Sequence, residues 1–177
     1  MKQLLRANWR ARAERRPSLA MRNAVALGLF LAAQFAGAAP AAGDKAAGAA
    51  QVVVLTQLPC QFVESENGID RGYSSRKQED CERINAQSGA ARVQGAKPLE
   101  LKPGRYVFRV TNKSVPYELG FWLRGAGLTG RARLPSVSGG GLTQGVTKDY
   151  EVVLKPGEYV YSCPLNTTPD YRLIVKN

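Results

Sequence analysis

The chain has 177 residues, and its composition (44% hydrophobic, 8% aromatic, 22% charged) is that of a soluble globular protein with one ordinary domain and an appendage. It excludes an intrinsically disordered chain and a multi-pass membrane protein. The complete absence of histidine excludes Ser-His-Asp triads, Cys-His dyads, HExxH zinc sites and copper centres with two imidazoles. The net charge is +11, but seven of the 25 Lys and Arg residues and only one of the 14 acids lie in residues 1–38. We therefore do not expect nucleic acid as a partner.

The first 38 residues have the pattern of an export signal. A basic stretch ending at Arg22 precedes an apolar run over residues 24–33, and Ala36-Gly37-Ala38 forms a small-residue cleavage site. An apolar run of this length is well short of the roughly 20 residues that span a bilayer. We interpret residues 1–38 as a signal peptide, with an uncleaved anchor as the alternative. The mature protein is expected to be periplasmic or secreted, without stable membrane insertion after cleavage.

The rest of the chain divides into a flexible Ala/Gly tether over residues 39–50 and a folded domain over residues 51–177. A Leu-Lys-Pro-Gly turn followed by an alternating strand occurs twice in the domain, at 101–108 and at 154–161. Pro-Gly favours a tight turn, and alternation then places every second side chain on one face. The side chains predicted to face the core are Tyr106, Phe108 and Val110 in the first copy and Tyr159, Tyr161 and Cys163 in the second.

Short strands separated by Pro and Gly turns predict an all-β Greek-key sandwich. The remaining strands are expected at 51–56, which should be buried, and at 118–124, 149–154 and 171–176. One short helix is expected over 75–86, with Ser74 or Ser75 as its cap. The glycine-rich segment 125–145 is expected to be a long surface loop.

Three cysteines in an exported protein suggest a disulfide and one odd thiol. Cys60 and Cys81 enclose a polar segment, and a bridge between them would contribute roughly 3 kcal/mol by restricting the unfolded chain. Cys163 is then a free thiol, or it takes Cys60 or Cys81 as its partner. The pairing Cys60–Cys81 and the alternative Cys60–Cys163 both stay open at this point.

Three motifs together resemble the cupredoxin family. They are Pro-Gly-x-Tyr-x-Phe-x-Val-x-Asn at 103–112, the apolar strand at 118–123, and Pro-Gly-Glu-Tyr-x-x-x-Cys at 156–163 with a terminal Tyr-Arg-Leu-Ile-Val. The likeness is strongest to the EfeO-type cupredoxin-like domain of periplasmic iron-uptake proteins, and it covers 51–177 with an insertion at about 61–96. The resemblance implies a Greek-key cupredoxin-like β-sandwich with one short helix in that insertion.

The same resemblance implies a candidate metal site. Cupredoxins hold copper with a His that follows the Asn and with a Cys-x-x-His loop near the C-terminus. Here the first position falls at Tyr117 or Glu118, and the loop after Cys163 contains neither His nor Met, so the ordinary type 1 copper ligands are absent. The EfeO-type pattern implies Cys60, Glu118 and Cys163 as metal ligands instead, with copper or iron as the cofactor.

Two functions follow as hypotheses. The first is an exported metal-binding or redox module that handles copper or iron through Cys60, Glu118 and Cys163. The second is a metal-free interaction domain, stabilised by a disulfide, that docks a periplasmic or inner-membrane protein. Arg124, Arg131 and Arg133, in the glycine-rich loop, could recognise a phosphate or an acidic partner, or simply be solvated. No cluster of acid, base and nucleophile is visible, so we do not expect an enzyme.

Overall fold

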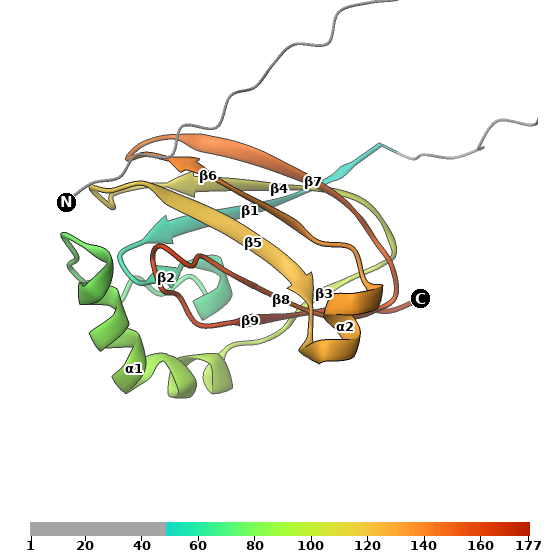
Figure 1. The fold of residues 1–177 in the computed structure, drawn as a ribbon, viewed down its shortest axis with the longest axis horizontal. Helices are drawn as coiled ribbons and strands as arrows, with labels where there is room; N and C mark the ends of the chain where they lie inside the picture. Colours follow the sequence, from blue (N-terminus) through green and yellow to red (C-terminus); the bar gives the residue numbers. More distant parts are fainter. Residues whose placement is uncertain (1–48) are drawn as a thin grey trace, which may run out of the picture. The chain divides into compact units, whose positions relative to one another are not determined.

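The computed structural model describes residues 49–177, which form a sandwich of two β-sheets (Figure 1). The first sheet has the strand order β2-β1-β4-β7, made of Gln61–Phe62, Gln51–Leu58, Gly104–Asn112 and Thr147–Leu154. The second has the order β3-β9-β8-β5-β6, made of Leu99–Leu101, Tyr171–Val175, Gly157–Ser162, Leu119–Gly125 and Val137–Leu142. The helical elements are η1 (Glu64–Glu66), α1 (Gln78–Gly95) and α2 (Gly127–Arg133).

The connections between the sheets give the predicted cupredoxin-like Greek-key sandwich. The chain passes from β4 in the first sheet to β5 and β6 in the second, returns to β7, and ends with β8 and β9 in the second sheet. In the described region β1 pairs parallel with β4 and β3 pairs parallel with β9, while the other strand pairs are antiparallel.

The core is formed by the side chains that alternation assigned to it. The two Pro-Gly turns start β4 and β8, and the inward residues of both strands are at most 3% exposed: Tyr106, Phe108, Val110, Tyr159, Tyr161 and Cys163. At their centre the ring of Phe121 lies 5.4 Å from that of Phe108, in a stacked arrangement. Full burial of side chains of this size contributes about 1.5–3 kcal/mol each, so this layer stabilises the sandwich.

The helix in the insertion is longer than predicted, and it starts and ends elsewhere. It runs over 18 residues, Gln78–Gly95, instead of 75–86. The helix start is held by the carboxylate of Asp80, which accepts hydrogen bonds from the backbone N–H groups of Arg76 (2.8 Å) and Lys77 (3.2 Å), and not by Ser74 or Ser75. The helix has no apolar stripe, because its buried residues are only Cys81, Gly89 and Arg92.

The expectation of a long loop over 125–145 was wrong, because this segment contains α2 and the edge strand β6. Glycines obscured the strand in the sequence, but here they permit a close approach of two backbones. A Cβ on Gly120 of β5 would lie 2.7 Å from the carbonyl oxygen of Gly139 in β6. The glycines therefore mark a tight strand contact rather than an irregular loop.

The expectation of a fully buried first strand was also wrong. β1 is Gln51–Leu58, and only its second half is buried; Val52 and Val54 are 51% and 55% exposed. The reason is that Val52 and Val54 point to the outer face of the sheet, while the alternate residues Val53 and Leu55 point to the core. In addition, β2 pairs only with Gln57 and Leu58, so the first half of β1 is an open sheet edge.

The predicted signal peptide and most of the predicted tether lie outside the described residues. Among residues 49–177, none of the helices combines the length and the apolar character needed to cross a bilayer.

Candidate functional site

The three cysteines lie at one end of the sandwich, where β1 and β8 end and β5 begins; we call this end the Cys163 pole. Cys60 and Cys81 form a disulfide, and both are fully buried. The bridge joins the end of β1 to the second turn of α1. The pairing Cys60–Cys81 is therefore present, and the alternative Cys60–Cys163 is not.

Cys163 is a free thiol with no exposed surface. Its Sγ accepts hydrogen bonds from the backbone N–H groups of Gly120 (3.4 Å) and Asn166 (3.3 Å). Its own N–H donates to Oγ1 of Thr168 at 2.8 Å, which fixes the turn after β8. Burial raises the pKa of the Cys163 thiol, and the backbone N–H groups around it only partly offset that rise. A thiol in this environment stays protonated and unreactive.

Asn166 contacts all three cysteines, with hydrogen bonds to Cys60 and Cys163, and it is fully buried. Its side-chain oxygen accepts from the N–H of Cys60 at 2.8 Å and lies 3.3 Å from Sγ of Cys81. Its side-chain nitrogen donates to the carbonyl of Leu58 at 2.8 Å. Beside it, buried Gln57 donates to the carbonyl of Gly120 at 2.9 Å. The interior of the pole is thus filled by amides whose hydrogen bonds are satisfied within the protein.

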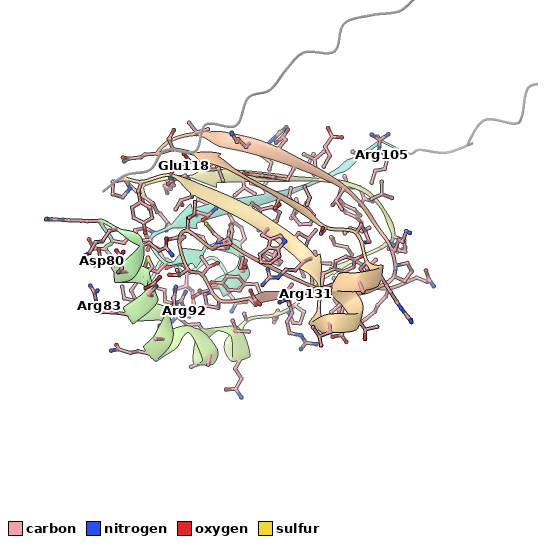
Figure 2. All side chains as sticks on the ribbon, in the orientation of Figure 1. Asp80, Arg83, Arg92, Arg105, Glu118 and Arg131 are labelled. Atoms are coloured by element: carbon pink, nitrogen blue, oxygen red, sulfur yellow. A yellow bond between two sulfur atoms is a disulfide. The ribbon has the colours of Figure 1, made fainter. Side chains whose placement is uncertain are left out.

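Glu118 lies outside this interior. It immediately precedes β5 and is exposed, as Figure 2 shows. Its Oε1 accepts a hydrogen bond from the backbone N–H of Gly141 in the edge strand β6, at 2.7 Å. An acid in an otherwise apolar strand is explained here by the backbone donor that it satisfies at a sheet edge.

The insertion covers the other position at which a first copper ligand would fall. Tyr117 is half-buried, and its hydroxyl donates to Oγ of Ser75 at 3.3 Å and lies 3.7 Å from Sγ of Cys81. Both contacts are to the insertion, and Cys81 is already committed to the disulfide. Tyr117 therefore packs the insertion against the pole.

The residues of the pole do not fit a copper or iron centre. Cys60 is not a thiolate while the bridge is closed, Cys163 is enclosed by backbone donors, and Glu118 is bound to β6 on the surface. In the part of the chain that the structure describes, no three His, Cys, Asp or Glu side chains are grouped so as to hold a metal ion. Soft or borderline metals prefer several sulfur or imidazole donors, and here only one sulfur is free.

A buried ion pair attaches the insertion to the sandwich. Glu66 of η1 and Arg92 of α1 have side chains that are 0% and 4% exposed, and Nη2 of Arg92 lies 2.6 Å from Oε1 of Glu66. Nη2 of Arg92 also donates to the carbonyl of Cys60 at 2.9 Å, and the hydroxyl of Tyr171 donates to Glu66 at 2.5 Å. Sequence reasoning missed this cluster, because nothing local in the sequence pairs an acid with a base 26 residues later.

An open apolar depression lies next to the buried thiol. It has a volume of about 350 Å³ and is lined by Gly120, Phe121, Trp122, Ser138, Gly139, Gly140, Pro164 and Leu165. It therefore joins β5 and β6 to the turn that follows Cys163. Three of the lining residues are glycines, so backbone forms part of the lining, and Leu165 at its rim is 38% exposed. Side chains that face outward on a sheet are hard to identify from a glycine-rich sequence, so the depression was not predicted.

Arg124 is not part of a basic loop. It lies in β5, is 6% exposed, and makes a two-pronged ion pair with Asp170 at 2.6 and 2.7 Å. Its guanidinium also lies over the ring of Trp122, 4.0 Å from the centroid. Arg124 is thus committed to internal contacts, whereas Arg131 and Arg133 at the end of α2 are exposed.

A scan of protein-family models and a search of curated proteins found no match to this chain. Solved structures do show similarity. Auracyanin B matches with a TM-score of 0.45 and 13% identity over 72% of this chain and 90% of its own. Lac15 from a marine microbial metagenome and a multi-copper oxidase from Pediococcus acidilactici match with TM-scores of 0.36 and 0.35 and identities of 14% and 10%. They cover 75% and 78% of this chain, which spans 28% of each of them. At these TM-scores, the similarity to these structures supports no conclusion about function.

Proposed function

We propose that this chain is an exported cupredoxin-like domain that works without a metal, as a non-enzymatic binding module stabilised by the Cys60–Cys81 disulfide. The observation that carries the proposal is the state of the cysteines: two are joined to each other, and the third is enclosed by backbone donors. The alternative of copper or iron handling through Cys60, Glu118 and Cys163 would require the disulfide to open and Glu118 to leave Gly141.

The apolar depression beside Cys163 is the surface that supports binding. Trp122, Pro164 and Leu165 contribute apolar atoms, and the glycines of β6 leave backbone within reach of a ligand. The amide of Asn166 ties the turn beneath it to Cys60, which the disulfide joins to α1. An open and apolar depression suits a segment of another protein, so the partner we propose is a periplasmic or inner-membrane protein.

A copper titration tests the metal-free proposal. The exported protein is purified with its disulfide intact, mixed with Cu(I) or Cu(II), desalted and analysed for bound metal and visible absorption. We expect no intense blue Cys–Cu(II) band and the same copper retention in wild type and Cys163→Ser, because Cys163 is unavailable. One equivalent of copper retained by wild type and lost in Cys163→Ser would contradict the proposal.

A second pair of variants tests directly whether Cys60, Glu118 and Cys163 can bind a metal. Cys81→Ser frees the thiol of Cys60, and Cys81→Ser with Cys163→Ser removes the second sulfur again. We expect both to retain equally little copper or iron under reducing conditions. Stoichiometric metal in the single variant that disappears in the double variant would establish the site of Cys60, Glu118 and Cys163.

Site-specific photo-crosslinking in cells tests the binding surface. A crosslinking residue at Leu165, on the rim of the depression, is expected to give a discrete adduct with another protein. Leu128 is the matched control, because it is 87% exposed but belongs to α2, away from the depression's lining. Equal adducts from both positions, or none from Leu165, would reject this surface.

A further inference from the structure

The first half of β1 has backbone groups that face an open sheet edge. At Thr56 the backbone N–H donates to Oε2 of Glu64 at 2.6 Å, and the carbonyl accepts from the N–H of Val63 at 3.0 Å. The polar groups of Thr56 therefore point away from β4. Because direction alternates along a strand, those of Val52 and Val54 point the same way. In residues 49–177 no strand pairs with them on that side.

Nothing in this edge prevents further pairing. Its residues, Gln51-Val-Val-Val-Leu55, contain no charge, proline or glycine, and they have high β-propensity. Soluble proteins usually protect an exposed edge with charges, proline, a bulge or a very short strand. The side chains of Val52 and Val54, about half exposed on the outer face, make this edge more apolar still.

The other described edges are protected. β3 has three residues, and β7 carries Lys148, Asp149 and Glu151. In β6 the carbonyl of Gly140 accepts from Nζ of Lys148 at 2.9 Å, and the N–H of Gly141 is bound to Glu118. The contrast within one molecule indicates that the β1 edge is occupied in the functional protein.

We propose that the free edge of β1 pairs with the same edge of a second copy of this chain, so that the protein forms a two-fold symmetric dimer. An antiparallel register centred on Val53 places Val52 of one copy opposite Val54 of the other, and the reverse. Each of these two pairs exchanges two N–H···O hydrogen bonds, so every free group of Val52 and Val54 is satisfied. A register centred on Val54 would instead need the N–H of Thr56, which Glu64 already holds.

The occupant is a second copy because the edge complements itself. Its own residues carry no charge, and the two charged side chains that flank it, Glu64 and Lys97, have opposite signs, so the edge selects neither an acidic nor a basic strand. The pairing also brings four exposed valines together on one face. Val107, beside Val52 in the sheet, extends this apolar area. Since β1 ends at the Cys163 pole and the pairing is antiparallel, the two poles of the dimer point in opposite directions. The interface is short, so we expect a weak dimer with a dissociation constant in the micromolar range or above.

Analytical ultracentrifugation of the exported protein tests the dimer. We expect the mass to rise from one chain to two as the concentration increases through the micromolar range. Val54→Lys should remain monomeric over the same range, because a charge is placed at the paired edge. Val153→Lys is the matched control: Val153 is 56% exposed on β7, and its substitution adds the same charge, so this variant should dimerise as wild type does.

Amide hydrogen exchange then identifies the interface. The N–H groups of Val52 and Val54 should become protected as the concentration rises, while Val153 stays unchanged. Wild type that is monomeric throughout, or Val54→Lys that dimerises as wild type does, overturns the proposal. So does a dimer that leaves both amides unprotected. Because Val54 is exposed, Val54→Lys should fold; Val52→Lys serves the same test if it does not.

Discussion

Replacing Arg92 by leucine should be among the most damaging single changes in this domain. Arg92 binds both carboxylate oxygens of Glu66 through Nε (3.0 and 3.1 Å) and binds Oε1 again through Nη2. Removing the arginine takes away the buried cation of a carboxylate that is 0% exposed, and leaves it only the partly exposed Arg71, whose Nε lies 2.9 Å from Oε2. Breaking a buried pair on one side costs about 3–5 kcal/mol, so we expect a loss of that size in the free energy of unfolding at neutral pH.

The structure also predicts how the loss in free energy of unfolding caused by Arg92→Leu changes with pH. Burial raises the pKa of Glu66. Hydrogen bonds from Arg92, Tyr171 and Arg71, together with the charge of Arg92, lower it by more than burial raises it. The pKa in the folded wild type therefore lies below its usual value. Glu66 therefore stabilises the wild type above the pKa of the unfolded chain, and this contribution is lost as the pH falls through the folded pKa. Arg92→Leu removes the hydrogen bonds and the charge of Arg92 and keeps those from Tyr171 and Arg71, so we expect the pKa of Glu66 to be higher in this variant than in wild type. The difference between the two proteins should therefore shrink as the pH falls from neutral to mildly acidic.

Urea unfolding at several pH values measures both effects. Arg109→Leu is the control, because Arg109 makes an equally short two-pronged pair with Asp149, but the side chains are 49% and 43% exposed. We expect a small loss there that weakens with added salt. The reasoning is refuted if Arg92→Leu costs no more than Arg109→Leu, or if its cost grows as the pH falls.

Two further predictions concern the bridge and the export signal. Replacing Cys60 and Cys81 together by alanine should lower the free energy of unfolding by about 3 kcal/mol, because the bridge no longer restricts the unfolded chain. Urea unfolding measures this loss, and an unchanged urea midpoint would contradict the prediction. The exported protein should begin at Ala39, and intact-mass analysis checks this; a mass that retains residues 21–38 would indicate an uncleaved anchor.

The sandwich could be predicted because its strands alternate and its turns carry Pro-Gly. Tyr106 and Tyr159, each two residues after a turn glycine, fall on the core side as the period of two requires. This signal depends only on neighbouring residues. It is lost where a strand lacks side chains: β6 contains Gly139-Gly140-Gly141, and its pairing with β5 depends on a backbone approach that no local pattern shows.

Helix α1 shows a second reason why part of the structure could not be predicted from the sequence. It has no apolar face, and it is held to the sandwich by single long-range contacts such as the bridge from Cys81 and the hydrogen bonds of Arg92 to the carbonyl of Cys60 and the hydroxyl of Tyr171. Such contacts have no periodicity, so the sequence indicated a helix there but not its length. The same holds for the Cys163 pole, where Asn166 reaches back to Cys60 across 106 residues. That Cys163 points into the core was predictable from alternation, but the amide that links it to the disulfide was not.

The reactivity of Cys163 decides between a structural thiol and a functional one. Its Sγ is enclosed, and burial raises its pKa, so at neutral pH the folded protein should hold it as a protonated thiol out of contact with solvent. A thiol reagent should then label native protein only as fast as the pole opens, while one thiol per chain reacts at once in denaturant. Asn166→Ala removes the side-chain bonds to Cys60 and Leu58 and should speed labelling of the native protein, whereas Glu118→Ala, on the surface, should not. Labelling of the native wild type at the rate of a free cysteine would show an accessible thiolate. In that case Cys163 would be available as a ligand, and the metal-free function proposed for the pole would have to be abandoned.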